Sequence, residues 1–239
     1  TTRVPSGATL AVSGSGTGRQ LNNYALELAG TGTWAPTTAN MNSGSGGTLR
    51  VLAGGTLDVT GDFGMLFNQG GAASRLVVAP SGTLRRITSA SPVQFTMVAD
   101  DSGSVNVQTG TLDLSGGGSS SGVFSISIGA TLEFGGGTHT LSAASSVSGA
   151  GLVSLSAGTM TSAGAWSVTG TTRLVSGAAN FNGAAMTTAI LDVLGGTLGG
   201  TGLLTATGTA TWSGGNLTGG GGTTRVPSGA TLAVSGSGT

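Results

Sequence analysis

Residues 48–59 read TLRVLAGGTLDV, two short runs of alternating apolar and polar residues joined by a Gly-Gly pair. Alternation with a period of two is typical of a β-strand with one buried side, and glycine pairs are typical of tight corners. In the second run, Leu57 and Val59 are expected to point inward. Thr56 and Asp58 then point to water. The segment therefore predicts two short strands that meet at a glycine corner.

The same corner pattern is copied along the chain. It recurs at residues 1–12, 74–85, 104–114, 124–134 and 190–198. Repetition of this kind indicates a structural unit that stacks on its neighbours. A β-sandwich also uses short alternating strands, but it needs no copied corner. A helical fold is not expected, because no segment of helical length keeps a 3.6-residue apolar period free of glycine.

We therefore predict an all-β fold, a parallel β-solenoid or β-helix, right-handed because parallel crossovers strongly prefer that hand. The leucine after the corner threonine marks each coil, and it or its replacement stands at Leu10, Leu57, Leu84, Leu112, Leu132, Met160, Ala179, Leu198 and Leu232. Two long gaps contain further strand-like stretches, at 31–34 and 209–212, which predict two more coils. The expected total is about ten coils per 222-residue repeat, each of about 22 residues.

A longer repeat encloses the coils. Residues 1–17 recur unchanged as residues 223–239, an offset of 222 residues. Residues 1–222 are thus interpreted as one tandem-repeat unit and 223–239 as the start of the next identical unit. The expected partners are neighbouring copies of the repeat, end to end. Lateral self-association is also expected, because only 7% of the residues are charged and neighbouring rods repel one another weakly.

Composition narrows the function. Hydrophobic residues make up 37% of the chain, a balance typical of a folded protein. The eight basic residues are all arginines and are matched by eight acidic ones, so no basic stripe for nucleic acid is expected. No stretch approaches the roughly 18 consecutive apolar residues of a membrane span. There is no cysteine for a disulfide or a thiolate metal site.

Candidate catalytic groups are few. His139 is the only histidine, and no glycine-flanked serine of the G-x-S-x-G type stands at a strand-to-helix junction. We expect a structural or surface role for His139, and we predict a protein that is not an enzyme, with no catalytic residue, metal or cofactor.

Carboxylates offer a remote enzymatic alternative, because some β-helix enzymes cleave acidic polysaccharides with carboxylate-bound calcium and a basic residue. The candidates are Asp58 with Asp62 and the adjacent pair Asp100 and Asp101. In a strand, the adjacent pair would point to opposite sides. Asp58 and Asp113 are interpreted as occupying the same outward position of matching coils. This arrangement favours a solvated face over a catalytic cluster.

The arginines are interpreted as scattered surface charge. Arg85 and Arg86 form the one adjacent basic pair, and Arg3, Arg173 and Arg225 each follow two threonines.

Two surface roles stay open besides. Outward threonines next to the marker leucines form a potential threonine ladder, a feature also of ice-binding solenoids, although the Thr-x-Thr spacing here is irregular. Exposed aromatic side chains would stack on glycans, whereas buried ones would pack at corners, which we favour. The aromatic candidates are Trp34, Trp166, Trp212 and Tyr24.

The segments GGGTHTL (135–141), VSGAG (147–151) and GTATWSGG (208–215) carry a resemblance. The whole chain resembles the glycine- and threonine-rich β-solenoid repeats of giant bacterial secreted or surface proteins, akin to autotransporter and haemagglutinin-like adhesin stalks. The resemblance implies a structural part of an extracellular fibre or cell-surface stalk. It also implies an alternative, an adhesin that binds glycans or other cells. The expected location is extracellular or at the cell surface.

Overall fold

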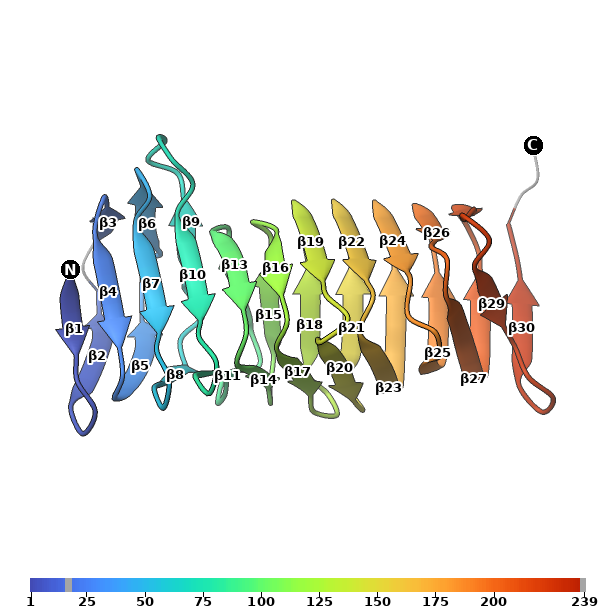
Figure 1. Ribbon diagram of the computed structural model, residues 1–239, viewed down its shortest axis with the longest axis horizontal. Helices are drawn as coiled ribbons and strands as arrows, with labels where there is room; N and C mark the ends of the chain where they lie inside the picture. The colour runs from blue at the N-terminus through green and yellow to red at the C-terminus, as the bar shows by residue number, and fades with distance from the viewer. Residues whose placement is uncertain (16–18, 237–239) are drawn as a thin grey trace.

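The computed structural model describes residues 1–15 and 19–236, and every regular element within these ranges is a β-strand. The strands pair in parallel, and successive turns lie side by side along one axis. The two termini consequently lie at opposite ends of an elongated rod (Figure 1). The predicted parallel β-solenoid is confirmed.

Each turn contributes one strand to each of three faces, which we name A, B and C in chain order. Face A contains β1 (Thr2–Val4), β4 (Ala25–Leu28), β7 (Thr48–Val51), β10 (Arg75–Val78), β13 (Val98–Asp101), β16 (Gly118–Ser120), β19 (Thr138–Leu141), β22 (Thr159–Ser162), β24 (Ala178–Phe181), β26 (Thr197–Gly199) and β28 (Asn216–Leu217). Face B contains β2 (Thr9–Gly14), β5 (Thr31–Pro36), β8 (Thr56–Val59), β11 (Thr83–Arg86), β14 (Ser104–Val107), β17 (Val123–Ile126), β20 (Ser146–Gly149), the first parts of β23 (Ala165–Leu174), β25 (Met186–Val193) and β27 (Leu203–Trp212), and β29 (Thr223–Arg225). Face C contains β3 (Gln20–Asn22), β6 (Met41–Gly44), β9 (Met65–Phe67), β12 (Pro92–Phe95), β15 (Thr111–Leu114), β18 (Thr131–Phe134), β21 (Leu152–Leu155), the second parts of β23, β25 and β27, and β30 (Thr231–Val234).

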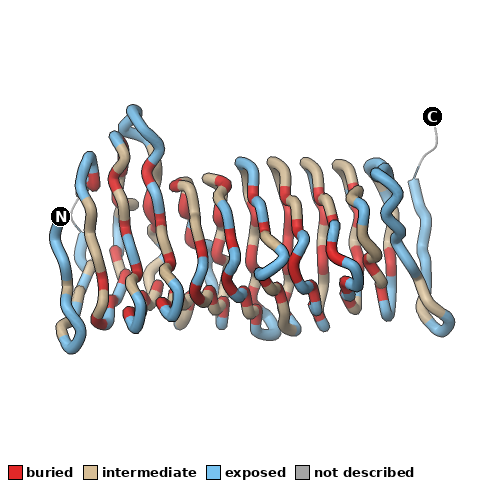
Figure 2. Tube along the Cα trace, viewed as in Figure 1, coloured by how far each residue is buried: buried red, intermediate tan, exposed pale blue. Residues whose placement is uncertain are grey.

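Like residues stack on like in successive turns. On face B, Leu57 pairs with Leu84, and Leu84 pairs with Val105. All three side chains point inward and are buried, whereas the outward Thr56 and Thr83 pair beside them. The inside and outside positions predicted for residues 56–59 are therefore confirmed. Figure 2 shows buried positions alternating along the middle turns, while both ends of the rod are exposed.

Glycines serve two separate purposes at the corners. β7 and β8 are joined by residues 52–55, as predicted, and Gly54 has a φ of +75°, which glycine adopts without steric cost. At Gly47 the constraint is space, because a Cβ atom would lie 1.8 Å from the carbonyl oxygen of Leu21 in the preceding turn. A larger residue at position 47 would push two turns apart.

Turn length falls along the chain. Arg86 pairs with Val59, 27 residues earlier, whereas Asp192 pairs with Arg173, 19 residues earlier. The later turns are shorter because β23, β25 and β27 run from face B to face C as single strands, with no separate corner. Face A has eleven strands, so the chain makes ten turns from β1 to β28. The predicted number of about ten coils per repeat is confirmed.

The marker residues do not share one face, as had been expected. Face B holds Leu10, Leu57 and Leu84, face C holds Leu112, Leu132 and Leu232, and face A holds Met160, Ala179 and Leu198. The gaps of 28 residues therefore span one turn and one further face. The physical reason is that alternation specifies only which side chains point inward, and each face accepts the same pattern. The additional coils predicted at 31–34 and 209–212 are present, in β5 and β27.

Candidate functional site

The outward carboxylates are dispersed over different faces. Asp58 lies on face B and accepts two hydrogen bonds from Arg85, at 2.6 and 2.7 Å. Asp113 lies on face C and accepts hydrogen bonds from Gln94 at 2.8 Å and Ser115 at 2.6 Å. The interpretation that Asp58 and Asp113 occupy matching outward positions is wrong, because the corner motif changes face between them.

Asp100 and Asp101 point to opposite sides of β13, as expected. Asp100 lies outward and pairs with Arg75. Asp101 points into the rod and is 4% exposed, where it accepts hydrogen bonds from the Gly103 amide at 2.9 Å and from the Ser120 hydroxyl at 3.2 Å. Burial raises the pKa of Asp101 to about 6, against the hydrogen bonds that lower it. The two carboxylates therefore cannot act on one outward ligand.

His139 is part of the interior. Its Nε2 atom lies 3.0 Å from the carbonyl oxygen of Leu114, and its ring packs edge-on against Phe134 with centroids 4.8 Å apart. Burial lowers the pKa of His139, so the ring is neutral and Nε2 carries the hydrogen donated to Leu114. The hollow that both His139 and Asp101 line has a volume of about 10 Å³, space for about one water molecule. This interior has no room for a substrate.

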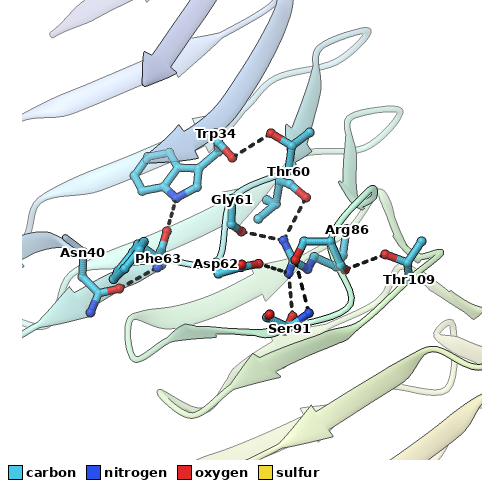
Figure 3. A network of polar contacts seen from close by, with 12 residues as sticks. Trp34, Asn40, Thr60, Gly61, Asp62, Phe63, Arg86, Ser91 and Thr109 are labelled. Atoms are coloured by element: carbon cyan, nitrogen blue, oxygen red, sulfur yellow. Dashed lines mark hydrogen bonds and ion pairs between the residues drawn. The ribbon is translucent and has the colours of Figure 1, made fainter. Parts of the chain in front are cut away.

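Arg86 is the strongest departure from the expected surface charge (Figure 3). Its side chain is fully buried, and its guanidinium donates to the carbonyl oxygens of Gly61 at 2.5 Å and Ser91 at 2.6 Å. A further bond of 2.8 Å reaches the carboxylate of Asp62. Hydrogen bonds from Ser89, and then from Arg86, lower the pKa of Asp62. Arg86 thereby ties together the connections that follow β8 and β11, and it holds Asp62 away from Asp58.

Arg86 also shows a signal that the sequence analysis overlooked. In Thr83–Arg86 the period of two that places Leu84 inside also places Arg86 inside. A charge at an inward position indicates a buried, hydrogen-bonded group.

The three Thr-Thr-Arg segments lie on three different faces. Arg3 lies on face A beside Glu27, Arg173 on face C, and Arg225 on face B beside Thr205. Arg173 donates to Asp192 in the next turn at 3.1 Å. These arginines, like Arg85 and Arg75, follow the expectation of dispersed surface charge.

Two of the three tryptophans are interior. Trp34 and Trp166 are buried, with their indole nitrogens donating to the Phe63 carbonyl at 2.7 Å and to the Thr172 hydroxyl at 3.0 Å. Corner packing, the favoured interpretation, is confirmed for both. Trp212 is partly exposed.

Tyr24 and the threonines lie on the surface. Tyr24 is 47% exposed, with its hydroxyl 3.0 Å from that of Thr2. The threonine ladder is shorter than expected, because it is divided between two faces. Face B stacks Thr9, Thr31, Thr56 and Thr83, and face C stacks Thr111 and Thr131.

The most distinctive surface lies at the C-terminal end of the rod. There the apolar residues Leu217, Leu232 and Val234 are exposed, the last two by 56% and 63%. The strands β29 and β30 have a partner in the preceding turn and none beyond. A hollow of about 230 Å³ lies between the last turns, lined in part by Phe181, Leu198 and Leu217. This arrangement leaves backbone groups and apolar side chains ready to pair with a further turn.

Other sites were sought over the same part of the chain. Within residues 1–15 and 19–236, three or more histidine, aspartate or glutamate side chains do not gather at any point where they could hold a metal ion. Nor do the described ranges contain a helix with the length and hydrophobicity to cross a membrane.

The fold and its open end define the chain as a parallel β-solenoid. No protein-family model, no curated protein and no solved structure matches it.

Proposed function

We propose that this protein is a structural segment of a long rod, built by stacking tandem solenoid repeats, in an extracellular bacterial fibre or a cell-surface stalk. One observation carries the proposal. The second copy of the 17-residue sequence folds as the eleventh turn, and its strands β29 and β30 pair in register with β27. The start of a second unit thus continues the stack without a joint. The proposed role requires no catalytic group.

The surface charges support a rod that maintains its register. Ion pairs join neighbouring turns on each face, at Arg75 with Asp100, Arg85 with Asp58 and Arg173 with Asp192. Because each arginine has its partner one turn away, a slipped register would separate opposite charges. The resemblance to bacterial surface repeats supports the extracellular location of the proposal.

A longer chain tests the rod. Residues 18–239 are appended once more after Thr239, which gives two complete units, and particle length is measured by small-angle scattering and electron microscopy. A unit of ten turns and one face adds about 50 Å, since parallel strands stack about 4.8 Å apart. A straight rod longer by this amount supports the proposal. Two separate bodies joined by a hinge would refute it.

The matched control changes only the junction. Leu232→Asp with Val234→Asp in the first of the two junction copies places charges at inward positions between the units. The same composition then exists elsewhere without the defect. We expect the control to bend or break at one place while each unit remains folded.

A second candidate, glycan adhesion, is favoured by Tyr24. Its exposed ring borders Thr2, whose hydroxyl its own hydroxyl contacts. Aromatic faces stack on sugars, and neighbouring hydroxyls donate hydrogen bonds to them. A glycan array with the full chain and with Tyr24→Ala tests this role. Binding that the substitution abolishes would establish adhesion, and an absence of binding by the full chain would leave the rod as a spacer.

A further inference from the structure

The identical 17-residue sequences lie on different faces. In the first copy, Thr2–Val4 belongs to face A and Thr9–Gly14 to face B. In the second copy, Thr223–Arg225 belongs to face B and Thr231–Val234 to face C. The 222-residue offset is therefore ten turns and one additional face. A whole number of turns would have returned the second copy to face A.

The three faces accept the same sequence elsewhere in the chain. The Thr-Leu-x-apolar motif occurs on face B at 56–59, on face C at 111–114 and on face C again at 131–134. In all three strands the second and fourth residues are buried. Since the inward positions are filled in the same way on two faces, a change of face involves no exchange of buried and exposed positions.

The first copy shows what covers the second. There, β2 pairs with β5 over six residues, and Trp34 lies beside Val12. Under this cover Leu10 and Val12 are only partly exposed, although they too lie near an end of the rod. Their equivalents Leu232 and Val234 lack such a cover and are exposed. The missing occupant therefore has the sequence of Thr31–Pro36.

We infer that the C-terminal end of the rod is a docking surface for a further copy of this repeat, whose strand equivalent to Thr31–Pro36 pairs with β30 on face C. Each unit is then turned by one third of a turn relative to the unit before it. Every outward residue recurs on a new face in each successive unit and returns to its first face in the fourth. This inference rests on the proposed rod, and it adds the identity of the docking strand and the rotation between units.

The rotation has a consequence for any surface group. The connection between β9 and β10, residues 68–74, projects from one side of the rod (Figure 1). With the inferred rotation, three successive units present this projection in three directions. A rod whose units were aligned would present all of its projections along one side. An array of rotated units would thus offer the same group to neighbours all around its axis.

Single-particle cryo-electron microscopy of a three-unit chain tests the inference, with residues 68–74 as the marker. We expect one projection per unit, about 50 Å apart along the axis, each turned by a third of a turn. Projections on a single side would overturn the inferred rotation while leaving the rod intact. Units that do not form one continuous rod would instead refute the proposed function, so the two failures are distinguishable.

Cross-linking in the 239-residue chain provides a second test, because the chain contains no cysteine. Ala233 lies beside Thr211 on face C, whereas the placement of the first copy would bring it beside Thr205 on face B. We compare Thr211→Cys with Ala233→Cys against Thr205→Cys with Ala233→Cys, using a short bis-maleimide. Efficient linking of the first pair alone is expected. Linking of the second pair, or of neither, would overturn the inference.

Discussion

Replacing Asp101 by asparagine should stabilise the protein at neutral pH. The Asp101 carboxyl lies inside the rod with two hydrogen-bond donors, the Gly103 amide and the Ser120 hydroxyl. Asparagine has nearly the same shape, and its oxygen can still accept from Gly103. What the substitution removes is the ionisation of a buried group. The effect must therefore depend on pH.

The magnitude follows from the pKa. Burial raises the pKa of Asp101 from its ordinary value of 3.8 to about 6. Between these values the folded chain keeps a proton that the unfolded chain releases, so stability falls as the pH rises from about 4 to 6. A difference of about two pH units corresponds to a loss of about 3 kcal/mol at pH 7.5. Asp101→Asn escapes this loss.

Urea unfolding followed by circular dichroism at pH 4 and pH 7.5 measures the difference. We expect Asp101→Asn to match the parent chain within about 0.5 kcal/mol at pH 4 and to exceed it by up to about 3 kcal/mol at pH 7.5. The matched control is Asp100→Asn, which loses an exposed ion pair with Arg75 and should change stability by less than about 1 kcal/mol at either pH. A destabilised Asp101→Asn at pH 7.5 would refute the reasoning, because it would mean that the ionised carboxylate is well solvated by its hydrogen bonds.

Three other substitutions test the interior. Arg86→Met should cost about 3 kcal/mol, because it leaves the carbonyl oxygens of Gly61 and Ser91 without their buried donor; chemical unfolding measures the loss. His139→Gln should weaken the dependence of stability on pH, because the lowered pKa of His139 means that the unfolded chain alone takes up a proton as the pH falls below about 6.5; thermal unfolding at pH 5 and 7 measures it. Gly47→Ala should cost about 2 kcal/mol, because its Cβ would overlap the preceding turn; the melting temperature reports it.

Each of these has a control. Arg85→Met removes an outward ion pair with Asp58 and should cost less than about 1 kcal/mol, so equal losses for Arg85 and Arg86 would contradict the buried network. For the histidine, unchanged pH dependence would show that the ring ionises equally in both states. Gly54→Ala meets open space and bears only the cost of a positive φ, about 1 kcal/mol. A larger loss at Gly54 than at Gly47 would contradict the close approach of the turns.

Most of the fold was predictable because it repeats a local rule. In residues 48–59 the alternation of apolar and polar residues and the glycine pair were sufficient to predict two strands, their corner and their buried sides. The tryptophan-ended stretches at 31–34 and 209–212 predicted two further coils by the same rule. The structure confirms all three. Local propensity and burial point to the same conformation at these positions, which is why reading the sequence succeeded there.

The candidate site was less predictable. The expectation that Arg86 lies on the surface followed residue type, whereas its place in Thr83–Arg86 follows the alternation, and the alternation holds. The buried position of Asp101 depends on β13 pairing with β10 and β16, which are distant in sequence. The open end with Leu232 and Val234 is a property of the stack, since identical residues near the other end are covered by Thr31–Pro36.

The sequence by itself determined that the chain forms short strands, that it turns at glycines, that alternate residues enter a continuous core, and that the pattern repeats after 222 residues. Only the tertiary structure decided on which of three faces each strand lies. The physical reason is that alternation distinguishes inside from outside at every residue but carries no information about rotation around the axis. That rotation accumulates from corner lengths, and turns of 19 to 27 residues sum to ten turns and one face.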